Sequence, residues 1–219
     1  MALSKFNFNS FDVTTAASTG LGFNASANGF STINPGAMTL IKTLTASSSS
    51  TVSFVHGSSD VVLDSTYPVY LFKFINMHAS AINAHFSVNF RDGGSSYDAT
   101  KTTTYIKVRH GENASLGSIV YDDGNDLAQS TASQKLHENS QTDNDSSLSG
   151  SMYLFNPAST TFVKHFASDI NSMANPSISD HILVSGYCNV TAAIDGVQFT
   201  FSSGNIDAGT IKLYGVSDS

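Results

Sequence analysis

The stretch AHFSVNFR, residues 84–91, alternates apolar and polar side chains along its whole length. In an extended chain the alanine, the valine and both phenylalanines point to one face, and the polar residues point to the other. This pattern predicts a β-strand with one face in a core and one face in water. The turn RDGGSSYD at 91–98 then leads into a second alternating run, Thr102–His110.

Short runs of the same kind recur from Met38 onward and are separated by clusters of glycine, serine, aspartate and asparagine. The predicted strands are 39–45, 51–55, 69–77, 84–91, 102–110, 151–155, 161–166, 182–190, 197–201 and 210–216. Strands of this number and length are enough for two packed antiparallel sheets, and 219 residues fit within one large β domain. We therefore expect an all-β fold, an antiparallel β-sandwich that is jelly-roll-like.

Two regions depart from this strand pattern. Residues 1–36 are rich in asparagine, serine, glycine and phenylalanine without sustained periodicity, and they predict an extended N-terminal arm ahead of a sandwich domain at 37–219. The arm either bridges subunits or forms a local strand pair over the sandwich's own edge. Residues 121–150 are polar and acidic, and we expect a long surface loop with one helical turn near 127–136.

The run VYLFKFINM at 69–77 is apolar on both faces apart from its lysine and its asparagine. A strand of this kind is covered on each side, by the core or by a neighbouring subunit. We therefore predict that aromatic residues of this strand and of the arm contact other copies of the chain. The candidates are Phe6, Phe8, Phe11, Phe23, Phe30, Tyr70, Phe72 and Phe74.

The composition argues against several classes of partner. The chain has 17 acidic and 10 basic residues, a net charge of −7, and no basic run, so neither nucleic acid nor an anionic membrane surface is expected to bind. No long apolar run predicts membrane insertion, and the N-terminus lacks the apolar region of a signal peptide, so the mature protein is expected to start at or near Met1. The single cysteine, Cys188, excludes an internal disulfide and is expected to be a small core residue.

No common catalytic signature is present, so we expect neither an enzyme nor a cofactor. Clustered carboxylates of the polar region are candidate calcium ligands, and solvated loop charge is the explanation that we favour for them. These candidates are Asp122, Asp123, Asp126, Asp143 and Asp145. Tyrosines at loops or outward strand positions are candidates for stacking on a glycan or for packing between subunits. They are Tyr97, Tyr105 and Tyr121.

Three stretches carry a resemblance to a known family: residues 38–78, YLFNPASTTFVKHF at 153–166 and AIDGVQFTFSSGNIDAGTIKLYGV at 193–216. Together they resemble bacteriophage virion proteins that are common in marine tailed phages and are described as structural or tail-fibre-like. The resemblance extends from about residue 38 to the C-terminus, and the closing SGNIDAGTIKLYGV is its most specific part. It implies a non-enzymatic component exposed on the surface of a phage particle.

Two functions of different classes follow. The first is a virion structural subunit that self-assembles, with a trimer as the expected oligomer, and that sits on the particle as a decoration or appendage beside other virion proteins. Its apolar strands would be buried between copies. The alternative is a receptor-binding tail-fibre or adhesin domain that recognises a host surface glycan. A depolymerase is the third possibility, and it would need two carboxylates in one cleft.

Overall fold

The structure is a computed structural model that describes residues 20–23, 26, 29–33, 37–174 and 177–217. The described residues contain strands and no helix, which confirms the prediction of an all-β fold. The strands are β1 (Gly20–Phe23), β2 (Phe30–Ile33), β3 (Met38–Ser49), β4 (Val52–Val55), β5 (Val69–Ala79), β6 (Phe86–Arg91), β7 (Lys101–Gly111), β8 (Gly117–Tyr121), β9 (Gln134–Lys135), β10 (Leu148–Phe155), β11 (Lys164–Ala174), β12 (Ile178–Cys188), β13 (Gly196–Phe201) and β14 (Ile206–Val216).

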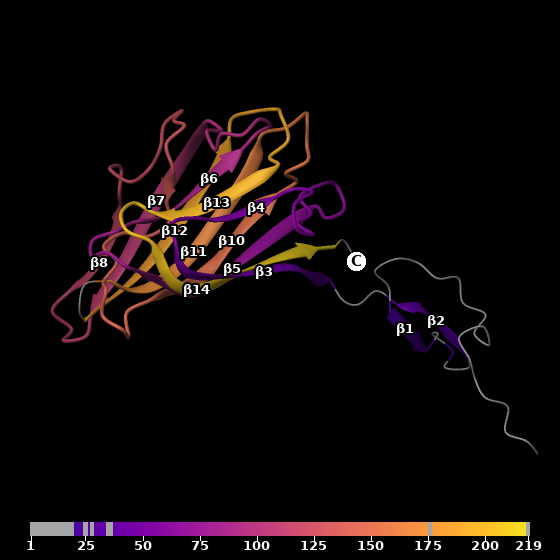
Figure 1. The fold of residues 1–219 in the computed structure, drawn as a ribbon. Coiled ribbons are helices and arrows are strands. Elements are labelled where there is room, and N and C mark those ends of the chain that lie inside the picture. Colours follow the sequence, from indigo (N-terminus) through magenta and orange to yellow (C-terminus); the bar gives the residue numbers. More distant parts are fainter. Residues whose placement is uncertain (1–19, 24–25, 27–28, 34–36, 175–176, 218–219) are drawn as a thin grey trace, which may run out of the picture.

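Two antiparallel sheets pack face to face as a sandwich (Figure 1). The eight-stranded sheet has the order β3-β14-β5-β10-β11-β12-β7-β8, and the four-stranded sheet has the order β4-β13-β6-β9. Along the chain, β3 to β6 alternate between the two sheets, and β9, β10, β13 and β14 do so again. This alternation is the jelly-roll arrangement, and the remaining strands widen the longer sheet on one side.

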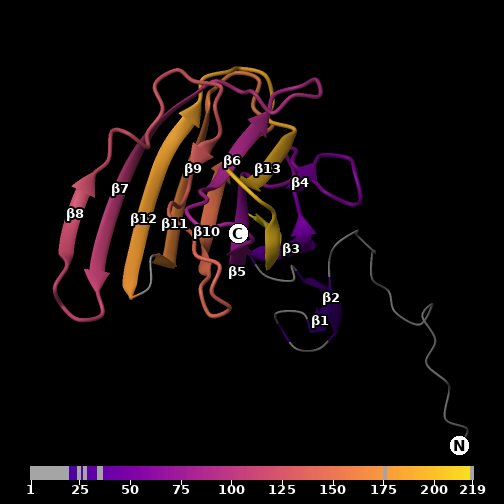
Figure 2. The ribbon, with the colours of Figure 1, turned by 60° about the vertical axis from the view of Figure 1, so that its left-hand side comes forward.

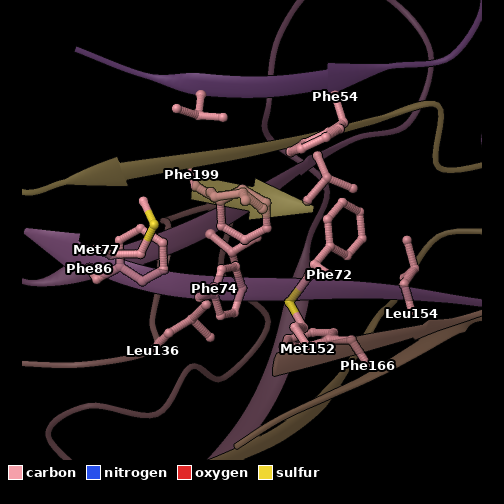
Figure 3. Close-up of a cluster of buried hydrophobic side chains, with 14 of the residues drawn as sticks. Phe54, Phe72, Phe74, Met77, Phe86, Leu136, Met152, Leu154, Phe166 and Phe199 are labelled. Atoms are coloured by element: carbon pink, nitrogen blue, oxygen red, sulfur yellow. The ribbon is translucent and has the colours of Figure 1, made fainter. Parts of the chain in front are cut away.

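Phenylalanine rings fill the space where the two sheets overlap (Figure 3). Phe199 of β13 lies 5.1 Å from Phe74 and 5.5 Å from Phe72 of β5, measured between ring centroids. Phe54 and Phe86 complete the cluster, and all five side chains are at most 2% exposed. Most of these rings meet edge to face, an arrangement that stabilises aromatic pairs beyond the burial of their area.

The cluster corrects one prediction about β5. Tyr70, Phe72 and Phe74 were expected at an interface with another copy, but they point into the core of the same chain and are 0%, 0% and 2% exposed. The sequence could not decide this, because both faces of β5 are apolar. The residues on its other face are Leu71, Lys73 and Ile75.

The far half of the eight-stranded sheet is not covered by the four-stranded sheet (Figure 2). Residues 122–147, which we call the covering segment, lie over its inner face and hydrogen-bond to β7 and to β6. Within this segment Gln134 and Leu136 are fully buried and His137 is 1% exposed. The prediction of a surface loop with a helical turn is therefore wrong, because the segment is irregular, contains no helix, includes β9 and forms part of the core.

The covering segment also explains why the expected wet face of β6 is dry. Phe86, Val88 and Phe90 face the core as predicted, but Ser87 and Asn89 on the opposite side are only 5% and 8% exposed. Asn89 donates to the carbonyl of Thr131 in the covering segment. An alternating sequence therefore identifies the polar face of a strand, but that face can be buried under another segment of the protein.

The described part of the arm forms a small antiparallel hairpin of β1 and β2, with the rings of Phe23 and Phe30 stacked 5.2 Å apart. A local strand pair was one of the two predictions for the arm. No strand of the sandwich pairs with it among the described residues, and Figures 1 and 2 place it beyond the β3 side of the sandwich. Phe6, Phe8 and Phe11 lie outside the described residues.

The last strand, β14, lies second in the longer sheet, between the edge strand β3 and β5. The predicted strand at 210–216 is the second half of β14, which pairs with β3 on one side and with β5 on the other. Gly204, with a φ of +66°, makes the turn before it, whereas Gly209 lies within β14 at a bulge. The predicted strands 151–155 and 161–166 lie on either side of Pro157 and belong to β10 and β11, which pair with each other as a hairpin.

Candidate functional site

The face of the eight-stranded sheet that turns away from the four-stranded sheet, here called the outer face, carries an uncovered band of apolar side chains. One row crosses four strands, because Leu40, Tyr214, Leu71 and Tyr153 are successive partners in register. Leu40 is 50% exposed and Tyr153 is 41% exposed, whereas Leu71 between its neighbours is 4% exposed. Leu40 and Tyr153 are thus accessible to a partner, although the row is closely packed around Leu71.

A second row runs beside the first. Met38, Val216, Val69 and Phe155 are again successive partners in register, and the rings of Phe155 and Tyr153 stack at 6.2 Å. Beyond these rings the outer face is hollowed over β11 and β12 into two shallow depressions of about 420 and 320 Å³. Small residues, among them Ala167 and Ser185, form the floor of both.

A third apolar group lies at the far end of the same face, on β7 and β8. Ile106 pairs with Tyr121 and Val108 pairs with Ile119, so all four side chains point to the outer face. Ile119 is 77% exposed and Tyr121 is 55% exposed. Apolar side chains therefore lie at both edges of the outer face, and small or polar residues such as Ala167, Ser185 and Asp169 separate the two groups over β11 and β12.

Charge on the outer face is separated between strands. Lys73 and Lys212 lie directly opposite each other on β5 and β14, and neither makes an ion pair with a described carboxylate. Asp169 on β11 and His181 on β12 form a pair at 2.8 Å, and the Asp169 side chain is 63% exposed. A cationic area and an anionic area thus flank the apolar rows on one surface.

The dimensions of this face are those of a protein interface. Eight strands span about 34 Å across the sheet, and eleven-residue strands span about 36 Å along it, so the face measures on the order of 1,000 Å². A stable interface needs roughly 800 Å² from each partner, and exposed apolar patches of a few hundred Å² or more mark interaction sites.

A second group of functional residue types lies inside the molecule, where the covering segment meets β7. The Lys107 ammonium donates to Glu138 and to Asp122, and Asn125 donates to both carboxylates. Burial raises the pKa of each acid, but the hydrogen bonds and charge of Lys107 together with the Asn125 amide hold both pKa values below their usual range. This network fixes the covering segment against β7, and both of its carboxylates are engaged by Lys107 and Asn125.

Neighbouring buried polar groups are less completely paired. Arg109 donates to one carboxylate oxygen of Asp180, which is fully buried, while the other oxygen has no partner in the described part of the chain. The hydroxyl of Tyr105 and Nε2 of His137 are also buried without a hydrogen-bond partner in the described part of the chain. Burial lowers the pKa of His137 to about 3, so its ring is neutral in the folded protein.

The calcium candidates do not form one site. Asp122 accepts from Lys107, Asp126 accepts from the hydroxyl of Tyr121, and the backbone carbonyl of Asp143 accepts from His78. Asp123 is exposed, and Asp145 lines a polar hollow together with His78 and Asp207. Within the described ranges no three histidine, cysteine, aspartate or glutamate side chains are placed to hold a metal ion.

The three tyrosines proposed for glycan stacking are not brought together. Tyr105 is fully buried on the inner face of β7, so its prediction as a surface residue is wrong. Tyr97 is half-buried in the turn between β6 and β7 and lies near Gly196, whereas Tyr121 ends the edge strand β8. Cys188 is fully buried, as predicted, and burial raises the pKa of its thiol to about 12.

Sequence reasoning missed the outer face as a whole. Its rows join residues from strands far apart in the chain, so strand order and register had to be known before they became visible. One signal was present, since Val69, Leu71 and Ile75 made 69–77 apolar on both faces.

No part of the chain that the structure describes forms a helix long and apolar enough to cross a membrane. Comparison with protein families, with curated proteins and with solved structures finds no match for this chain.

Proposed function

We propose that this chain is a non-enzymatic structural subunit of a bacteriophage particle that assembles with copies of itself through the outer face. The single observation that carries self-assembly is the apolar band of the outer face, which crosses β3, β14, β5 and β10 and leaves Leu40 and Tyr153 50% and 41% exposed. The assignment to a phage virion is supported by the sequence resemblance of residues 38–216.

The chemistry of the outer face suits a second copy of the same chain. Its apolar rows offer tyrosine, phenylalanine and methionine side chains, which are enriched in the centres of interfaces, together with Leu40. The unpaired Lys73 and Lys212 lie on the same face as the exposed Asp169, so a neighbouring copy can supply the opposite charge at both places. Because one face carries both the lysines and the aspartate, copies of the chain can contact one another in a closed symmetric oligomer. The oligomer that we expect is a trimer.

The glycan-binding alternative finds less support, because one of its three tyrosines is in the core and the other two lie on different elements. Glycan binding is kept as the second candidate because of a polar hollow of about 570 Å³ next to His78. The lining of this hollow contains no tyrosine, phenylalanine or tryptophan on which a sugar ring could stack.

The experiment is to measure the mass of the full chain by light scattering over a wide concentration range, together with one face variant and one control. Tyr153→Lys places a charge in the centre of the apolar row, and we expect it to shift half-assembly to about tenfold higher concentration or more. Ile82→Lys alters a side chain that is 61% exposed but lies outside the strands, so assembly is expected to be unchanged. A wild-type chain that is monomeric at every concentration, or equal effects of both variants, would contradict the proposal.

A further inference from the structure

The two edges of the eight-stranded sheet are chemically different. At one edge, β3 carries Lys42 and a polar, serine-rich second half, which are features that discourage pairing with a foreign strand. At the other edge, β8 has the sequence GSIVY, without any charged residue or proline. Ile119, Val120 and Tyr121 of this strand are 77%, 42% and 55% exposed. An apolar edge strand without protection is a template for a further strand.

The hydrogen bonds of β8 identify which backbone groups are open. Asp122 N–H donates to the Tyr105 carbonyl, and Gly111 N–H donates to the Leu116 carbonyl. Because bonded pairs alternate along an antiparallel ladder, Ser118 and Val120 also bond to β7. The N–H and C=O groups of Gly117, Ile119 and Tyr121 therefore point away from β7, and no described strand pairs with them. The edge offers three donors and three acceptors in a row.

The chain itself contains a segment of matching chemistry. The sequence KFNFNSF at 5–11 alternates phenylalanine and asparagine, so in an extended conformation Phe6 and Phe8 share one face. On the edge of β8, that face would continue the apolar strip of Ile119 and Tyr121. The asparagine side of the segment has no charge, so pairing would cost little desolvation.

The position of the arm decides whose edge it can reach. The β1–β2 hairpin lies beyond the β3 side of the sandwich, and β8 forms the opposite side in both views (Figures 1 and 2). About 34 Å of sheet separates the two edges. Residues 12–19, which connect the described hairpin to residue 11, span at most about 30 Å when extended, so residues 5–11 are expected to reach the β8 edge of another copy rather than their own.

We propose that residues 5–11 of one copy add as a further strand to the β8 edge of the next copy. The inference rests on the proposed self-assembly and deepens it, because it names a second contact besides the outer face. The contact is heterologous, with different surfaces on the two partners, and repetition around an axis closes a ring. The arm thus joins each subunit to its neighbour by backbone hydrogen bonds.

The test uses proline at the open edge. Ile119→Pro removes an outward N–H that takes no part in the β7 ladder, and proline is tolerated on an edge strand at such a position. Ile119→Ala is the matched control, because it removes the same side chain and keeps the N–H. We expect Ile119→Pro to raise the concentration of half-assembly about tenfold above that of Ile119→Ala, with an unchanged circular dichroism spectrum.

The arm is tested in the same way within the full chain. Phe6→Ser with Phe8→Ser should weaken assembly as much as Ile119→Pro, and adding Ile119→Pro to it should cause no further loss. Asn7→Ser with Asn9→Ser is the control. Because the chain has no tryptophan, Phe8→Trp provides a single fluorescent reporter whose emission should shift to the blue as the protein assembles.

The outcomes separate this inference from the proposed function. If the chain assembles but neither Ile119→Pro nor the double serine variant has an effect, the arm does not bind β8, although the outer face still assembles. An effect of Ile119→Pro without one of the serine variant means that β8 pairs with another β8, which overturns the role of the arm. A blue emission that does not depend on protein concentration means that the arm folds onto its own chain, which also overturns the proposal.

Discussion

The two halves of the interior are built from different chemistry. Between the four-stranded sheet and β5, the core is dominated by phenylalanine rings such as Phe199 and Phe74, and this cluster of rings contains no charged side chain. Between the covering segment and β7, the core contains Lys107, Glu138 and Asp180. The first half is closed by a sheet and the second by an irregular chain.

The difference has a physical cause. A sheet satisfies its own backbone groups and can offer a fully apolar face, whereas an irregular segment has backbone and side-chain polar groups that need partners inside the protein. The buried ions of β7 provide such partners and fix the segment in one position. The polar half should therefore contribute less to stability and should respond to pH, whereas the aromatic half should not.

The largest effect should come from the aromatic half. Phe199→Ala removes a ring that contacts four other phenylalanines, and we expect the free energy of unfolding to fall by about 3–5 kcal/mol in urea denaturation. Phe162→Ala is the control, because that side chain is 69% exposed, and it should change stability by less than about 0.5 kcal/mol. Equal losses for the two variants would contradict the assigned core.

A smaller effect is expected at the centre of the polar half. Lys107→Met leaves Glu138 and Asp122 without their cation, and we expect a loss of about 2–3 kcal/mol, since removal of one partner strands a buried charge. Adding Glu138→Gln to Lys107→Met should recover part of the loss, because fewer charges are then left without a partner. An additive double variant would show that the residues do not interact.

The polar half should also make stability depend on pH. His137 has a folded pKa of about 3 against an ordinary value of 6.5, so the unfolded chain binds a proton that the folded chain excludes. Stability is complete above pH 6.5 and falls toward pH 3, by up to about 1.4 kcal/mol per pH unit. Burial lowers the pKa of His85 as well, which acts in the same direction.

Urea denaturation at pH 7.5 and at pH 5.5 measures this slope above the range in which the carboxylates titrate. His137→Gln should reduce the difference between the two pH values, whereas His110→Gln, at an exposed position, should leave it unchanged. If the wild-type protein is equally stable at both pH values, His137 does not stay neutral in the folded state.

The smallest effect is expected on the outer face. Lys73 and Lys212 lie opposite each other, and like charges in this position destabilise a sheet, so Lys73→Gln should stabilise the monomer by about 0.2–1 kcal/mol at low salt. Lys212→Gln should give the same gain, and the double variant should give little more. A loss of stability in either variant would mean that the two lysines have a partner within the chain.

Sequence patterns predicted the aromatic half well, because alternation along strands such as β6 and β13 identifies the side chains that face the aromatic core. They failed in the polar half for two reasons. The strands β8 and β9, with five and two residues, are too short to show a period. The buried Gln134 and Glu138 look like surface residues in any sequence, because only their partners on β7 make burial tolerable.

The candidate site was predictable only in part. The apolar character of both faces of 69–77 indicated a covered outer surface, but it assigned Tyr70, Phe72 and Phe74 to the wrong side. Which face of a strand is buried depends on which sheet packs against it. That packing is determined by the whole chain and not by the strand's own sequence. The unprotected edge of β8 became recognisable only when the strand order was known.

The position of β14 has a consequence for synthesis of the protein. Met38 pairs with Val216 and Val69 pairs with the same residue, so the first and third strands of the sandwich are joined only by the last. During synthesis β3 and β5 cannot be joined until β14 has left the ribosome, so both strands keep an open edge until then. Truncation of the chain before β14 should therefore abolish folding of the whole sandwich, rather than remove one strand.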